Sequence, residues 1–231
     1  MIAPLSKRLS VCAELVPPCE TVADVGADHG YLGIRLLQLG RCRQVIASDL
    51  RQKPLASARA NAERFGTADR MRFVQSDGLK SIMPGSFQTL VCAGMGGDCI
   101  TQIIDSAPWL KDSRYTLVLQ AQSSGNDLRR WLGNNGFELR RERLVQDGRF
   151  LYGVMLVVWG QGSALSPGGQ YVSPALLREH DPLICPYLDR LLRSLRATVA
   201  GISRSDTEED RRKLAYYSAA LAEITEIRRK L

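Results

Sequence analysis

The sequence predicts an α/β protein: a mostly parallel sheet of seven strands, followed by a C-terminal α-helical hairpin. Apolar runs alternate with segments of helical periodicity up to about residue 135, which is typical of a parallel sheet with helices on both faces. Two strand-like runs then follow each other directly across Asp147-Gly148, a dipeptide that favours a hairpin turn. From residue 171 onward the spacing of apolar residues is helical only.

The first half of the chain shows the alternation clearly. Leu5, Leu9, Cys12 and Val16 recur at helical spacing before Pro17-Pro18, so a helix is expected to open the chain. The next segments predict strands over 21–25, 44–48 and 71–75, and helices over 31–39 and 54–65.

The second half of the sheet ends differently. Strands are expected over 88–92 and 115–119, with helices over 98–106 and 125–135. The runs 137–145 and 149–159 then predict an antiparallel pair. A parallel sheet closed by an antiparallel pair is typical of the class I methyltransferase (Rossmann-like) fold, whereas a dinucleotide-binding Rossmann domain normally lacks that pair.

Composition divides the chain into three segments. We expect a ligand-binding domain over 1–160, a Gly/Ser/Pro-rich linker over 161–170 and a helical hairpin, similar to a coiled coil, over 171–231. Residues 205–208 have capping-box spacing for the second helix. The apolar stripes of the two helices are Ile184, Leu188, Leu191, Leu195, Val199 and Ile202, and Leu214, Tyr217, Leu221, Ile224 and Leu231.

The charge favours a nucleic-acid partner. The formal net charge is +7, and 25 of the 31 basic residues are arginine, which binds phosphate bidentately and stacks on bases. The alternative is an arginine-rich proteome. In the hairpin, the arginines expected to meet phosphates, unless they form an ordinary solvated face, are Arg190, Arg193, Arg196, Arg204, Arg211 and Arg212.

Several classes of protein are disfavoured. The first ten residues lack the apolar core of a signal peptide, and no apolar run is long enough to span a bilayer. Six cysteines without a Cys-x-x-Cys pair, beside only two histidines, make a metal site unexpected. We therefore expect a cytoplasmic protein with no metal and no membrane contact, monomeric or weakly oligomeric.

The loop after the first strand, Asp24 to Gly33, is the most informative segment. Its glycines allow backbone N–H groups to approach a ligand. A dinucleotide fingerprint would need glycine at Asp28 and Tyr31. A carboxylate at Asp28 would repel a diphosphate but would tolerate a cation such as S-adenosyl-L-methionine.

Three further features follow later strands. Asp49 stands where a carboxylate accepts hydrogen bonds from ribose hydroxyls, although an Asp there can also be a helix cap. Asp77-Gly78 is a candidate adenine contact or a plain turn. The segment Ala93-Gly94-Met95-Gly96-Gly97 allows a ligand to approach the backbone closely.

These motifs carry a family resemblance. DVGADHGYL, SDGL, AGMGG and LVLQ, together with the C-terminal hairpin, resemble the bacterial tRNA adenine-22 N1-methyltransferases (the TrmK family) over nearly the whole chain. The resemblance implies methyl transfer from S-adenosyl-L-methionine to N1 of an adenine in the D-arm region of tRNA. It implies a cofactor site lined by Gly26, Asp28, Asp49, Asp77 and Gly94, and a reacting centre near Asp28, His29 and Tyr31. The motifs add Asp24, Gly30, Gly78, Met95 and Gly96 as cofactor candidates, and Gln120 and Gln122 as catalytic candidates.

Two departures from the family pattern stand out. Gln120-Ala121-Gln122 replaces the Gln-Pro-Asn that often follows the fifth strand, and this exchange moves the terminal amide by one methylene. Gly30 and Gly33 replace an alanine and a proline in the first loop.

Other functions stay open at this point. The same core could serve another RNA or a small-molecule substrate, and a non-catalytic RNA-binding protein could keep the cofactor site. A nicotinamide oxidoreductase is disfavoured by the glycine spacing. The ligand that raises the thermal midpoint, NAD or S-adenosyl-L-methionine, distinguishes the last reading from the others.

Overall fold

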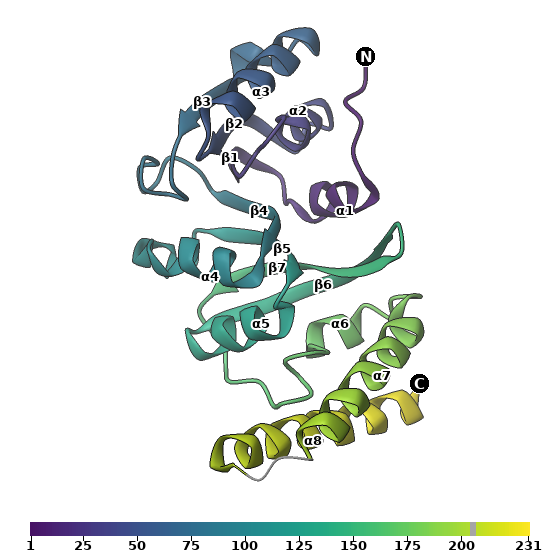
Figure 1. Cartoon of the computed structure of the whole chain (residues 1–231). Coiled ribbons are helices and arrows are strands. Elements are labelled where there is room, and N and C mark those ends of the chain that lie inside the picture. The colour runs from purple at the N-terminus through teal and green to yellow at the C-terminus, as the bar shows by residue number, and fades with distance from the viewer. Residues whose placement is uncertain (204–206) are drawn as a thin grey trace.

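The protein, described by a computed structural model over residues 1–203 and 207–231, is built around one seven-stranded sheet (Figure 1). The strand order is β3-β2-β1-β4-β5-β7-β6; the first five strands in this order are parallel, and β7 is antiparallel to both of its neighbours. The predicted fold class is confirmed. The strands are β1 Cys19–Val25, β2 Cys42–Asp49, β3 Met71–Gln75, β4 Thr89–Gly96, β5 Thr116–Ser123, β6 Phe137–Asp147 and β7 Phe150–Trp159.

Helices cover both faces of the sheet, as the alternation predicts. One core contains α1 and α2 residues such as Cys12 and Ile34, and the other contains α4 and α5 residues such as Ile100 and Leu128. The helices are α1 Lys7–Leu15, α2 Tyr31–Gln38, α3 Gln52–Arg64, α4 Gly97–Asp105, α5 Gly125–Asn134, α6 Pro174–Arg178, α7 Ile184–Ile202 and α8 Glu208–Lys230, with short 3-10 turns at Ala68–Arg70 and Pro108–Leu110.

The strands β4 and β5 extend beyond their predicted ends. The glycine-rich segment predicted as a loop continues β4 to Gly96, because Met95 pairs with Ala121 and Gly96 pairs with Ser123 of β5. A register shift at Ala93/Met95 makes this part of the ladder irregular. Gly94 and Gly96 therefore lie at the carboxyl end of a central strand rather than in a free loop.

The C-terminal helices form an antiparallel pair. Arg228 near the end of α8 pairs with Asp189 near the start of α7 at 2.8 Å. The predicted stripe of α7 needs one correction: Leu192 is buried and Leu191 only partly so, because α7 packs against β6 as well as α8. Thr207 caps α8 by accepting a hydrogen bond from the Asp210 N–H, whereas Arg204 and the Ser205 of the predicted capping box lie outside the described residues.

The segment predicted as a linker is held against its neighbours. Glu223 of α8 accepts hydrogen bonds from the Ser166 hydroxyl at 2.5 Å and the Gly168 N–H at 3.1 Å. On the sheet side, the buried Arg129 donates to the Gln170 carbonyl at 3.2 Å. The division of the chain at 160 and 170 stays a prediction, but these contacts fix the course of the segment between the sheet and the hairpin.

A buried ion pair lies where the C-terminal region meets the sheet. Arg129 of α5 is almost completely buried, Glu142 of β6 is completely buried, and the two form a close salt bridge. The Ser173 hydroxyl donates to Glu142 at 2.6 Å and also caps α6, a short helix that the sequence analysis missed. The C-terminal region is thus anchored on a charged network in the interior.

Candidate functional site

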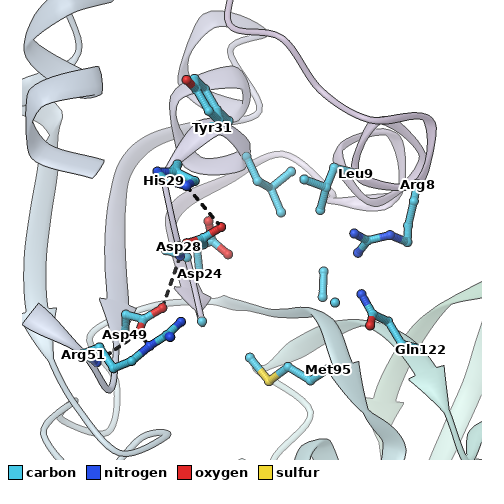
Figure 2. A pocket seen from close by; sticks show the side chains of 15 residues that line it. Arg8, Leu9, Asp24, Asp28, His29, Tyr31, Asp49, Arg51, Met95 and Gln122 are labelled. Carbon is cyan, nitrogen blue, oxygen red and sulfur yellow. Dashed lines mark hydrogen bonds and ion pairs between the residues drawn. The ribbon is translucent and has the colours of Figure 1, made fainter. Parts of the chain in front are cut away.

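A pocket of about 440 Å³ opens at the carboxyl ends of the parallel strands (Figure 2). Ligands bind at this edge in open α/β sheets, where the strand order changes direction; here β1 lies between β2 and β4. Nine predicted residues line the pocket: Asp24, Gly26, Asp28, His29, Tyr31, Asp49, Gly94, Met95 and Gln122.

The other predicted residues do not line it. Gly30 is packed on α3, where an added Cβ would stand 2.9 Å from the Ala58 Cβ. Asp77 is exposed and holds Lys80 at 2.5 Å. Gly78 lies against Ile103, Gly96 lies against Ser123, and Gln120 is completely buried behind the pocket wall. Their proposed roles therefore stay predictions.

Asp49 holds the first loop in place from the end of β2. Its side chain is almost fully buried, and its two oxygens accept hydrogen bonds from the Asp28 N–H at 3.3 Å and the Arg51 N–H at 3.0 Å. The N–H groups of Gly26 and Ala27 donate to the Ser48 carbonyl at 2.8 and 2.9 Å. The loop is thus pre-shaped around a fixed carboxylate.

Two glycines keep the pocket open. Gly26 has a φ of +73°, and a Cβ there would overlap the terminal methyl of Met95. Gly94 has a φ of +82°, and a Cβ there would stand 3.1 Å from an Arg8 nitrogen. L-residues rarely adopt such φ values, so both positions need glycine for conformation and for space.

Asp24 is the most perturbed acid of the pocket. The pKa of this carboxyl is raised to about 7: burial is the main cause, a hydrogen bond from the Gly33 backbone opposes it, and the nearby Asp49 adds to the rise. Its Oδ2 is buried without a hydrogen-bond partner among the described residues. A buried carboxylate with one unpartnered oxygen on a pocket wall favours a ligand that carries positive charge.

Arg8 and Arg51 are the charged residues of the pocket lining that the sequence analysis missed, and Arg8 is the one that faces the first loop. It extends from α1 and donates to the Gln120 Oε1 at 2.7 Å, and the same oxygen accepts from the Gly94 N–H at 3.1 Å. Figure 2 shows its guanidinium across the pocket from Asp24 and Asp28. The pocket therefore has Asp24 and Asp28 on one side and the Arg8 guanidinium on the other, while Arg51 is paired with Asp49 at 3.9 Å; this arrangement suits a zwitterionic ligand. In the sequence, Arg8 stands out only by its place in the helix expected to open the chain.

The exposed Asp28 and His29 of the first loop and the partly buried Tyr31 at the start of α2 line the pocket. Asp28 has a φ of +49° and lies 3.7 Å from His29 Nε2. The rings of His29 and Tyr31 are 6.2 Å apart, and Tyr31 meets Phe65 edge-on at 6.3 Å. A carboxylate and two aromatic rings at the pocket edge can receive a planar base.

Other site types find no support in residues 1–203 and 207–231. They hold no cluster of three His, Cys, Asp or Glu side chains suited to a metal ion. Nor do the helices described there include one long and apolar enough to cross a membrane. All six cysteines are free.

The fold and the pocket together define a nucleoside-binding α/β protein with the methyltransferase sheet order. Residues 5–155 match the methyltransferase-domain family. The chain belongs to that family.

Individual relatives are similar to this chain over nearly its whole length. The chain is 28% identical over 216 residues to the tRNA (adenine(22)-N(1))-methyltransferase of Bacillus subtilis, covering 91% of each chain. The crystal structure of the B. subtilis m1A22 tRNA methyltransferase TrmK superposes with a TM-score of 0.86 at 27% identity, over 98% of this chain and 99% of that one. A Streptococcus pneumoniae protein solved in complex with S-adenosyl-L-methionine gives 0.80 at 27% identity, over 96% and 99%. The resemblance predicted from the motifs is confirmed.

Proposed function

We propose that this protein transfers a methyl group from S-adenosyl-L-methionine to N1 of an adenine in tRNA, adenine 22 in the D-arm region. The observation that carries the proposal is the charge arrangement of the pocket. Buried Asp24, cationic Arg8, and Asp49 at the position suited to bind ribose hydroxyls surround one cavity. The similarity to the B. subtilis enzyme supports the choice of substrate.

The pocket residues fit the cofactor by chemistry. S-adenosyl-L-methionine supplies an electrophilic methyl group on a positively charged sulfur. The oxygens of Asp49 are suited to accept from the two ribose hydroxyls. Asp24, with its unpartnered oxygen, is suited to an ammonium group, and Arg8 to a carboxylate. Gly26 and Gly94 leave room at the backbone between them.

The reaction needs little acid–base catalysis by the protein. N1 of a neutral adenine has a free lone pair, so positioning is the main task. Because N1 lies on the Watson–Crick edge, the base must first be unpaired. Tyr31 and His29 can stack on it, and Gln122 offers an amide at the opposite side of the pocket. The product base is cationic, and the exposed carboxylate of Asp28 would stabilise its charge.

The substrate proposal is tested with two tRNA transcripts. Labelled S-adenosyl-L-methionine is supplied with unmodified bacterial tRNA and with the same tRNA in which adenine 22 is replaced by guanine. We expect transfer to the first and none to the second. Equal labelling of both would place the target elsewhere, and transfer to neither would favour a small-molecule substrate or a binding role.

Asp28→Asn tests the electrostatic role of that carboxylate. Removing a charge that stabilises the transition state should lower the single-turnover rate by roughly 10²-fold. Affinity for the cofactor should change little, because the Asp28 N–H that meets Asp49 is retained. Asn61→Ala, which removes the hydrogen bond that Asn61 donates to the His29 carbonyl at 3.0 Å, is the control for general disturbance of the loop. A full single-turnover rate in the Asp28 variant would remove this role.

The cellular setting follows from the same proposal. A tRNA-modifying enzyme works in the cytoplasm with tRNA as its macromolecular partner, and we expect it to act as a monomer. Light scattering at working concentrations, with and without tRNA, measures the oligomeric state. A stable dimer would contradict the expectation that the protein acts as a monomer.

A further inference from the structure

A second cavity, of about 240 Å³, adjoins the cofactor pocket and shares Gln122 with it. Its wall brings together the start of α5, strand β7 and helix α7, so the sheet and the C-terminal hairpin both contribute to it. The volume lies below the range of about 300–1,000 Å³ that is typical of sites for drug-sized ligands. One base or one nucleoside is an occupant of suitable size.

Aromatic residues connect this cavity to the first pocket. Phe150 and Tyr152 are on the same face of β7, with ring centroids 6.0 Å apart, and both line the second cavity. The guanidinium of Arg8, in the wall of the first pocket, lies 6.0 Å from the Tyr152 ring centroid. The side chains of Phe150, Tyr152 and Arg8 thus form a continuous row, here called the track, that leads from the second cavity to the first.

The outer end of the track carries two uncompensated cations. Arg149 and Arg190 lie 5.0 and 5.8 Å from the Phe150 ring centroid. Within residues 1–203 and 207–231, neither has a carboxylate at ion-pair distance, unlike Arg141 or Arg143 on the neighbouring strand. Phe150 itself is 40% exposed. An exposed ring between unpaired guanidinium groups is the combination with which proteins bind single-stranded nucleic acid.

We propose that the second cavity is a subsite for one nucleotide of the RNA that flanks the methylated adenosine. Its base stacks on Tyr152 and Phe150, and its phosphate is held by Arg190, with Arg149 beside it. Asn126 and Gln122 offer side-chain amides to the base edge. This subsite rests on the proposed function: it explains how a strand opened to present its adenine is held next to the reacting base.

The test measures single-turnover methylation of tRNA against enzyme concentration. Phe150→Leu and Arg190→Gln should each raise the half-saturating concentration about tenfold, with cofactor affinity unchanged by calorimetry. Arg196→Gln removes the same charge from the same helix without lining the cavity, and it measures the contribution of an ordinary arginine of α7. Effects no larger than that of Arg196→Gln would overturn the subsite.

A second arm changes the RNA. Two tRNAs are compared, one with an abasic nucleotide immediately 5′ of the adenosine and one with it immediately 3′. One of the two should bind the wild type about tenfold more weakly than intact tRNA. The same abasic change should cost Phe150→Leu clearly less than it costs the wild type, because one of the two stacking rings is already gone. Equal costs in both proteins would overturn the subsite while leaving methylation intact. Absence of methylation by the wild type would instead overturn the proposed function, and the subsite with it.

Discussion

At the scale of single residues, the site depends on groups whose surroundings differ from those of ordinary loop residues. Asp24 is buried without a partner for one oxygen, Gly26 has a positive φ against Met95, and Asp28 adopts a left-handed conformation that a non-glycine residue rarely takes. Each feature costs stability in the absence of a ligand. The pocket is therefore arranged for binding at some expense of folding free energy.

The raised pKa of Asp24 predicts a specific pH dependence of stability. The carboxyl has a usual pKa of 3.8, which burial raises to about 7 in the folded protein. Below pH 4 both states are protonated; between pH 4 and 7 the unfolded chain loses its proton first, so unfolding becomes more favourable as pH rises. The penalty grows by about 1.4 kcal/mol per pH unit, to about 4 kcal/mol above pH 7.

Asp24→Asn lacks this titration. The difference in unfolding free energy, variant minus wild type, should therefore increase from pH 4 to pH 7 and then level off. Urea unfolding at several pH values without ligand measures it. A difference that is constant with pH would show that Asp24 keeps an ordinary pKa.

Gly26→Ala tests the close approach of the backbone to the cofactor. The substitution forces a Cβ onto the Met95 methyl at a φ of +73°. Unfolding should become easier by about 1–3 kcal/mol, and binding of S-adenosyl-L-methionine should weaken by more than about tenfold. Gly40→Ala, also at positive φ but with open space around it, is the matched control for strain alone. Normal cofactor affinity in Gly26→Ala would contradict the assigned site.

At the scale of elements, α5 and β6 are joined by the buried pair of Arg129 and Glu142, and through Ser173 to α6. A buried ion pair adds little net stability, but removing one partner leaves an uncompensated charge in the interior. The pair therefore fixes where the C-terminal region sits on the sheet. Arg129 itself lines the second cavity and interacts with Tyr187 in the same wall, so the geometry of this network also shapes the proposed RNA path.

Arg129→Met should lower the unfolding free energy by about 3–5 kcal/mol. The double change Arg129→Met/Glu142→Leu should cost clearly less, because no charge is then left buried alone. Removing the surface pair Arg141–Glu179 is the control and should cost less than about 1 kcal/mol. If the single and double variants of the buried pair are equally destabilised, the network is not the anchor described here.

At the scale of the whole molecule, the hairpin is part of the folded unit rather than a detachable appendage. Leu144 of β6 shares a core with Val172, Leu176 and Leu188 of the C-terminal region. Removing residues 171–231 would uncover this core and the Arg129–Glu142 pair. We expect such a chain to unfold at least about 10 °C lower, in line with a loss of several kcal/mol. A truncated chain with an unchanged thermal midpoint and cofactor affinity would contradict this view.

The sequence carried the features that are encoded locally. The strands, most helices and the acids Asp24, Asp28 and Asp49 could be predicted, because apolar periodicity and strand ends are properties of contiguous residues. The extension of β4 could not be predicted, since it depends on pairing of Met95 with Ala121. Nor could the place of Arg8, whose partner Gln120 is 112 residues away. Whether Asp77 serves the cofactor stays a prediction, since in the structure it faces Lys80.

The most direct test of the central claim identifies the nucleoside that the protein makes. Full-length protein, S-adenosyl-L-methionine and unmodified bacterial tRNA are incubated, and the digested tRNA is analysed by mass spectrometry against N1- and N6-methyladenosine standards. We expect N1-methyladenosine, with a primer-extension stop at position 22 because N1 methylation blocks Watson–Crick pairing. A different methylated nucleoside, or no product from a protein that S-adenosyl-L-methionine stabilises, would contradict the account.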